Sequence, residues 1–252
     1  MSISKACCSI PPVLAKGYQP KGEYITLNGL KTYVVGPEFA TDAILLVYDI
    51  FGFFPQTLQG ADILATSSPI RQYRVFMPDF FEGSPADISW YPPTTETHQE
   101  KLNTFFQTKA GPLNTLSKIP GVISDANKSA SNGKGFAKWA IVGHCWGGKI
   151  ASLSAGQGNT TFQAAVQCHP AMVDPAEAKN VNVPMAMLAS KDEPSEDVEA
   201  YRSGLQVPHH FETFSTQIHG WMAARSDLED ELVRKEYERG YAVVLSFLEQ
   251  YF

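Results

Sequence analysis

Apolar runs that alternate with segments of helical periodicity constrain the fold of this chain most strongly. The run AILLVYDIFGF (43–53) is almost continuously apolar, as expected of a strand that is buried on both faces of a sheet. Further strands, each with the loop that follows it, are predicted at 73–81, 138–145, 162–170, 183–192 and 209–220. Helices are predicted at 55–68, 94–109, 112–131 and 227–250, with a break at Pro120-Gly121. This alternation predicts an α/β fold with a mostly parallel central sheet and helices on both faces.

A hairpin is expected before this alternation begins. Residues 23–37 alternate between apolar and polar positions, and Asn28-Gly29 in their middle is a turn signal. Residues 1–22 show no such pattern and predict an irregular arm. No repeat, linker or low-complexity tract divides the 252 residues. We therefore expect residues 1–252 to form one domain that includes this arm.

The composition excludes several classes of function. A formal net charge of −6 argues against a surface for nucleic acid or anionic membranes. No apolar run is long enough to span a membrane or to serve as a signal peptide, so a cytoplasmic location is expected. The cysteines Cys7, Cys8, Cys145 and Cys168 lack zinc spacing and predict neither a disulfide scaffold nor a metal site. The expected partner is a small molecule, and a monomer or a homodimer would both fit.

The motif GHCWG (143–147) stands between a predicted strand and a predicted helix that begins near Trp146. Gly143 and Gly147 flank Cys145 at the spacing that surrounds the serine of a nucleophile elbow. Most of a free thiol is protonated at neutral pH, but a helix N-terminus and a nearby imidazole both favour the thiolate. A cysteine between two glycines can also be a simple packing residue, so the motif alone does not decide.

Two later strand ends supply the groups that a nucleophilic thiol needs. Asp192 and His219 follow Cys145 in the chain order nucleophile, acid, histidine. His219 would take up and return the proton, and Asp192 would hold the imidazole in the useful tautomer. Glu193 competes for the role of the acid, although Asp192 is closer to the predicted strand end. Backbone N–H groups of Trp146 and Ile50 are expected to form the oxyanion hole.

Three stretches resemble the dienelactone hydrolase family of α/β-hydrolases, and its fungal members in particular: DIFGF (49–53), GHCWGGK (143–149) and HGW (219–221). Pro78-Asp79 and SKDEP (190–194) match the family at two further strand ends. The resemblance extends from about residue 21 to the end of the chain. It implies the α/β-hydrolase fold, hydrolysis of an ester or lactone through a Cys-His-Asp triad, and neither a metal nor an organic cofactor.

The resemblance also suggests residues that activate the thiol and bind the substrate. Asp49 stands where the family has a glutamate that can contact the nucleophile, which implies a role in thiol activation. Family enzymes that act on dienelactone hold its carboxylate with arginines, and Arg225 could serve in this way. The loop 79–93 contains no Arg or Lys, which favours a less anionic, aromatic ester or lactone. The side chains expected to line the substrate pocket are Phe80, Phe81, Trp90, Tyr91, His169, Trp221 and Arg225.

A second kind of function is compatible with the same motif. A non-hydrolytic protein of this fold could bind a ligand, or sense oxidants through Cys145. Asp192 and His219 favour hydrolysis, because a sensor needs no acid to orient a histidine. Turnover of a p-nitrophenyl ester before and after thiol alkylation distinguishes the two functions.

Overall fold

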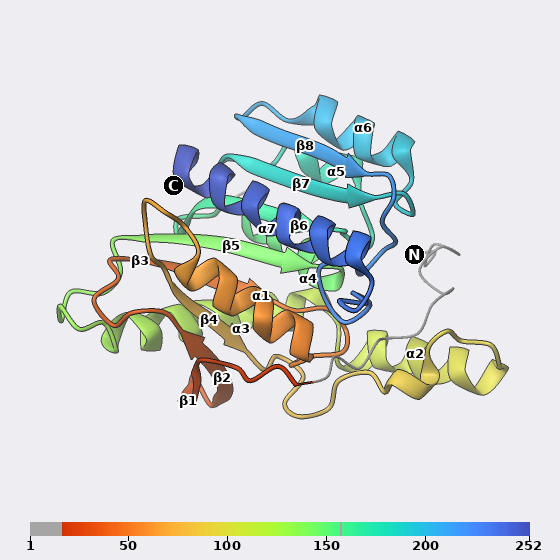
Figure 1. Cartoon of the computed structure of the whole chain (residues 1–252), viewed down its shortest axis with the longest axis horizontal. Coiled ribbons are helices and arrows are strands. Elements are labelled where there is room, and N and C mark those ends of the chain that lie inside the picture. Colours follow the sequence, from red (N-terminus) through yellow and green to blue (C-terminus); the bar gives the residue numbers. More distant parts are fainter. Residues whose placement is uncertain (1–16, 157) are drawn as a thin grey trace.

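The computed structural model describes residues 17–156 and 158–252 (Figure 1). Cys7, Cys8 and most of the expected N-terminal arm lie outside these residues, and residues 17–22 contain neither helix nor strand. One eight-stranded sheet has the order β1-β2-β4-β3-β5-β6-β7-β8. Its strands are β1 (Glu23–Leu27), β2 (Leu30–Val35), β3 (Asp42–Val47), β4 (Arg74–Pro78), β5 (Lys138–His144), β6 (Phe162–Cys168), β7 (Met185–Ser190) and β8 (His209–Phe214).

The strand pairing confirms the predicted hairpin and the mostly parallel sheet. Asn28 and Gly29 have φ angles of 48° and 75°, as a two-residue type I′ turn requires, and β1 pairs antiparallel with β2. The pairing between β2 and β4 is also antiparallel. Every pairing among β3 to β8 is parallel, so the carboxyl ends of these strands meet at one edge of the sheet.

Helices cover both faces of the sheet, as the alternating pattern predicts. In Figure 1, α1 and α7 pack beside each other on the nearer face, whereas α3 and α4 lie behind the sheet. The helices are α1 (Pro55–Thr66), α2 (Glu96–Thr108), α3 (Pro112–Lys128), α4 (Trp146–Ser154), α5 (Pro175–Ala178), α6 (Ser195–Gly204) and α7 (Glu231–Tyr251), and η2 (Ile88–Trp90) is a single 3₁₀ turn.

The break that was predicted at Pro120-Gly121 is wrong, because α3 continues through both residues. Proline removes one backbone hydrogen bond from a helix interior and crowds the carbonyl four residues earlier. Here Pro120 is on the exposed side of α3, while Ile119 and Val122 are buried against the core. Burial of this apolar face outweighs the local cost of the proline.

The sequence analysis missed α5 and α6, which follow β6 and β7. In α6, Glu196 and Asp197 lie in the first turn, where acidic side chains favour a helix N-terminus. Only Tyr201 of this helix is buried, so the apolar periodicity that identified the other helices is weak here.

Close packing of α4 against β5 and against β3 explains the two glycines of the motif. A Cβ atom on Gly143 would lie 1.9 Å from the carbonyl oxygen of Gly147. A Cβ atom on Gly147 would lie 2.1 Å from the carbonyl oxygen of Val47, in the neighbouring strand β3. Because backbone atoms cannot move aside as a flexible side chain can, both positions require glycine.

We expect Gly147→Ala to lower the free energy of unfolding by about 3 kcal/mol or more, since the added methyl group must displace β3 or α4. Gly111→Ala is the control, because φ is −64° at Gly111 and a Cβ there meets nothing within 4 Å. Urea unfolding followed by circular dichroism measures both changes. Equal stability of the two variants would contradict the close approach at Gly147.

Candidate active site

Cys145 occupies the sharp turn between β5 and α4. Its φ and ψ angles of 53° and −112° are strained for a residue that carries a side chain. Its backbone N–H donates to the carbonyl oxygen of Cys168 (3.0 Å), and its own carbonyl accepts from the N–H groups of Gly148 (3.0 Å) and Ala171 (2.9 Å). These bonds hold the residue at the N-terminus of α4, at the carboxyl edge of the sheet, with 8% of its surface exposed.

A cavity of about 1020 Å³ opens beside Cys145. The loops after β3, β5, β6, β7 and β8 contribute to its lining, as does one face of α2. Its size reaches the upper end of the range that small-molecule sites usually have. Among the predicted site residues, those that line it are Asp49, Ile50, Tyr91, Cys145, His219 and Arg225.

A buried carboxylate holds the imidazole of His219, and it belongs to Glu193. Nδ1 of His219 lies 2.6 Å from Oε1 of Glu193, and both side chains are almost fully buried. The second carboxylate oxygen of Glu193 accepts the backbone N–H of Ser190, at the end of β7. The imidazole is therefore fixed from its Nδ1 side by a carboxylate that is itself anchored.

The expected contact between Asp192 and the imidazole is not the one that the structure shows. Asp192 is only half-buried, and its Oδ2 accepts the backbone N–H of His219 at 2.9 Å. The chain turns at Lys191 and Asp192, where the Lys191 N–H donates to the carbonyl of Gln217 (3.1 Å). This turn brings Glu193 back over the sheet edge. Asp192 is closer to the end of β7 in sequence, but the carboxylate of Glu193 is the one that contacts the His219 ring.

The two expected oxyanion-hole residues both lie beside Cys145. Ile50 lines the cavity, and Trp146 is the first residue of α4. The N–H groups in the first turn of a helix have no intrahelical acceptor, which suits the role predicted for Trp146. The indole of Trp146 points into the core, where its Nε1–H donates to the carbonyl of Ala110 at 2.8 Å. The participation of both N–H groups in catalysis stays a prediction.

Asp49 joins two loops of the site. Its carboxylate accepts the backbone N–H groups of Phe51 (2.9 Å) and Ala224 (3.1 Å), which follow β3 and β8 respectively. Burial raises the pKa of Asp49 to about 6, although both hydrogen bonds and the nearby His219 and Arg225 oppose the rise. Its predicted role in thiol activation is untested, and its contacts show that it also fixes the cavity wall.

The raised pKa of Asp49 predicts a pH-dependent contribution to stability. Because folding favours the protonated carboxyl, this stabilisation is fully present below the pKa of the unfolded chain and is lost as pH rises through about 6. Between about pH 4 and pH 7 we expect the wild type to lose about 2 kcal/mol relative to Asp49→Asn, which cannot titrate there. Urea unfolding of both proteins across this range measures the difference. A constant difference would contradict the raised pKa.

Arg225 brings a buried positive charge to the cavity wall. Only 4% of the residue is exposed, and none of its three guanidinium nitrogens has a hydrogen-bond partner among the described residues. The guanidinium carbon lies 5.7 Å from the ring centroid of Tyr91. Gly220 permits this placement, because a Cβ there would lie 2.9 Å from Cδ of Arg225. Burial of an unpaired guanidinium is costly, so Arg225 is suited to an anionic ligand group.

Four aromatic residues that were predicted to line the pocket are not among the described residues that do so. Phe81 packs in the core against Trp146, with ring centroids 4.7 Å apart. Trp221 is fully buried against Phe214 at 4.3 Å. Phe80 is buried, and Trp90 lies beside α2 with the ammonium group of Lys101 5.6 Å from its ring centroid. Their position after strand ends could not distinguish packing against the core from exposure to the cavity.

His169 was also predicted to contact the substrate, but it is buried behind His219. The ring centroids of His169 and His219 are 5.3 Å apart, and the ring centroid of His144 lies 5.5 Å from that of His169. Burial lowers the pKa of His169 well below its ordinary value, and the neighbouring imidazoles lower it further. His169 therefore stays neutral and belongs to the packing beneath the cavity.

The sequence analysis did not predict that α2 forms a wall of the cavity. Its lining residues recur at the spacing of a single helix face, which was a detectable signal. They are Gln99, Leu102, Asn103, Phe106 and Gln107.

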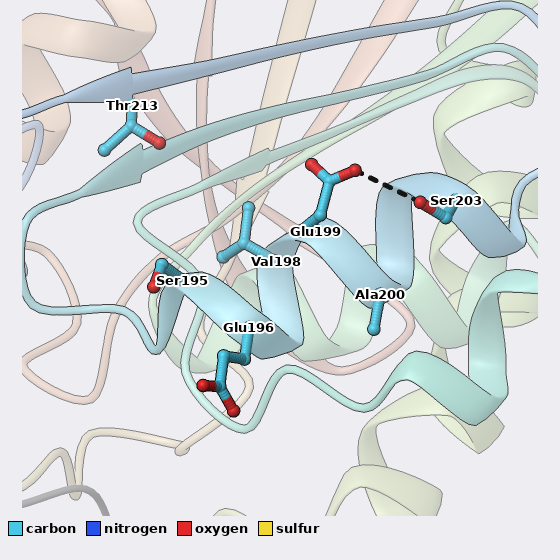
Figure 2. A pocket seen from close by; sticks show the side chains of 7 residues that line it. All are labelled: Ser195, Glu196, Val198, Glu199, Ala200, Ser203 and Thr213. Carbon is cyan, nitrogen blue, oxygen red and sulfur yellow. Dashed lines mark hydrogen bonds between the residues drawn. The ribbon is translucent and has the colours of Figure 1, made fainter.

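Figure 2 shows a separate hollow between α6 and Thr213 at the end of β8. None of the seven residues that line it is a cysteine or a histidine. The candidate chemistry therefore lies in the cavity beside Cys145.

Within the described part of the chain, no group of three or more His, Cys, Asp or Glu residues could hold a metal ion. No helix described here is long and apolar enough to cross a membrane.

Comparisons with known proteins agree with this fold and with the family that the sequence resembles. The model of the dienelactone hydrolase family matches residues 30–252. An AIM2 family protein of Schizosaccharomyces pombe is 35% identical, with 93% of each chain covered. The hydrolase pyvD of Aspergillus violaceofuscus is 26% identical, covering 99% of this chain and 98% of its own.

A crystal structure of dienelactone hydrolase from Anabaena variabilis has the same fold. Its TM-score is 0.65 at 14% identity, with 93% of this chain and 98% of the other covered. The fold class predicted from the sequence is confirmed. The match to the family model over most of the chain supports a hydrolase of the ester or lactone type. The chain belongs to the dienelactone hydrolase family.

Proposed function

We propose that this chain hydrolyses carboxylic esters or lactones with Cys145 as the nucleophile and His219 as the general base. The observation that carries the proposal is that Cys145, at the elbow, and His219, with Glu193 on its Nδ1, line one cavity. Glu193 accepts the Nδ1–H, which leaves Nε2 of His219 as the proton acceptor. Glu193 replaces Asp192 as the proposed orienting acid because of this contact.

The reaction proceeds in two steps. The Cys145 proton passes to His219 as sulfur attacks the carbonyl carbon, and the oxyanion is held by the N–H groups of Ile50 and Trp146. The carbon–oxygen bond then breaks, and His219 returns the proton to the leaving alkoxide. Water next attacks the thioester, giving its proton to His219. The thioester bond then breaks, His219 gives this proton to the departing sulfur of Cys145, and the carboxylic acid is released.

Thiol alkylation tests this function against the alternative of a non-hydrolytic binding or redox-sensing protein. We expect turnover of p-nitrophenyl acetate by the untreated protein and its loss after reaction with iodoacetamide. Addition of the ester before iodoacetamide should slow the inactivation, because both reagents compete for Cys145. Absence of turnover by protein whose thiol reacts readily with peroxide would favour the sensor.

Arg225 suggests that the preferred ester or lactone carries a carboxylate. We expect Arg225→Ala to raise KM for a carboxylate-bearing lactone about tenfold or more, with little change for its neutral methyl ester. A charge-assisted hydrogen bond that is equally strong in the enzyme–substrate complex and in the transition state affects KM rather than kcat. Arg234→Ala is the matched control, because Arg234 is exposed on α7. Equal changes in KM for both substrates would show that Arg225 does not select charge.

A further inference from the structure

The cavity-facing side of α2 has a composition that the proposed hydrolysis does not explain. In Figure 1 this helix lies apart from the layers that pack on the sheet, beyond the arrowhead end of β5. Only Leu102 and Phe105 of its thirteen residues are buried. The residues that line the cavity recur at intervals of three and four, so they form one continuous face. Leu102 belongs to the hydrophobic core and Phe106 packs against it, so packing accounts for the apolar members of this face but not for its exposed polar members.

Two kinds of side chain make up this face of α2. Leu102 and Phe106 are apolar, and the polar members Gln99, Asn103 and Gln107 are all carboxamides at successive intervals of four residues. The charged residues of the helix do not line the cavity; they are Glu96, Glu100 and Lys101. An exposed helix usually carries charges on its solvated face. A row of carboxamides beside an apolar row is suited instead to neutral groups that both donate and accept hydrogen bonds.

The carboxamides are already partly organised. Nε2 of Gln99 donates to Oδ1 of Asn103 at 3.2 Å. This bond leaves the amino group of Asn103 as a donor and the carbonyl oxygen of Gln99 as an acceptor. Aromatic rings stand elsewhere in the same cavity, with Phe51 and Tyr91 edge to face at 5.6 Å. The lining thus combines apolar and aromatic surface with neutral hydrogen-bonding groups.

We propose that this face of α2 is a subsite for an aromatic ring that bears neutral hydroxyl groups, in the part of the substrate remote from the scissile ester. The proposal rests on the proposed function, since it names the class of ester or lactone that the same cavity takes. A volume of about 1020 Å³ leaves room for such a ring beyond the reacting carbonyl. The carboxamides bind the hydroxyl groups, while Leu102 and Phe106 contact the ring.

Two matched pairs of esters test the subsite. Methyl 3-(3,5-dihydroxyphenyl)propanoate and methyl 3-phenylpropanoate place the ring on the acyl side. The acetates of the two corresponding 3-arylpropanols place it on the alcohol side. We expect the dihydroxylated member of at least one pair to have a kcat/KM about tenfold higher. The triple variant Gln99→Met, Asn103→Leu and Gln107→Met should abolish this preference. Gln250→Met, at an exposed amide of α7, should retain it.

Two further measurements separate failure of the subsite from failure of the proposed function. Turnover of p-nitrophenyl acetate by the wild-type protein reports whether the hydrolytic site works, whatever the preference for hydroxyl groups. Calorimetric binding of free 3-(3,5-dihydroxyphenyl)propanol and 3-phenylpropanol needs no hydrolysis. Turnover without any preference for hydroxyl groups would overturn the subsite only. If no ester is hydrolysed, tighter binding of the dihydroxylated alcohol, lost in the triple variant, still supports the subsite, and equal binding overturns it.

Discussion

Replacing Cys145 with alanine is expected to lower kcat/KM for p-nitrophenyl acetate about 10³-fold or more. Without sulfur no thioester forms, and only the oxyanion donors and substrate binding act on the carbonyl. The fold should survive, because alanine meets the same backbone constraint at φ 53° and removes only a small side chain. Steady-state kinetics and thermal unfolding of the purified variant measure the two effects.

Cys168→Ala is the matched control for this result. Cys168 is also a buried thiol, but it lies in β6, and its contact with Cys145 is through its backbone carbonyl. Its side chain can therefore be shortened without touching the proposed chemistry. We expect a modest loss of stability and near-normal turnover. Cys145→Ala with more than a tenth of wild-type activity would exclude Cys145 as the nucleophile.

Neutralising the carboxylate of Glu193 is expected to lower kcat far more than neutralising that of the adjacent Asp192. Glu193→Gln should lower kcat about 10³- to 10⁴-fold, because an amide can hold the imidazole in the wrong tautomer and cannot stabilise its charged form. Asp192→Asn should change kcat less than about tenfold, since Asp192 bonds the backbone of His219 and not its ring. Kinetics with p-nitrophenyl acetate compare the two variants directly. A larger loss in Asp192→Asn would restore Asp192 as the orienting acid.

Several features of the fold could be predicted because each depends on local sequence. The hairpin follows from Asn28-Gly29, which favours positive φ at both residues. The parallel strands follow from apolar runs that tolerate burial on both faces. The elbow follows from Gly143 and Gly147, whose missing side chains permit close contact of α4 with β5 and with β3. The sequence could therefore place Cys145 at the sheet edge.

Other features depend on how loops turn in space, which residue spacing does not specify. Asp192 and Glu193 are adjacent, and only the turn after β7 decides which carboxylate meets the imidazole. The aromatics Phe80 and Phe81 follow a strand end but enter the core. The burial of Arg225 depends on Gly220 and on the loop that Asp49 anchors. The substrate-facing side of the site was therefore the least predictable part.

The central claim is that an acyl group is transferred to Cys145. Its most direct test is intact-protein mass spectrometry after rapid mixing with p-nitrophenyl acetate and acid quenching, followed by peptide mapping. The account predicts a transient gain of one acetyl mass located on Cys145, and no such gain in Cys145→Ala. Turnover with an acetyl group on another residue, or an unchanged adduct in Cys145→Ala, would contradict it.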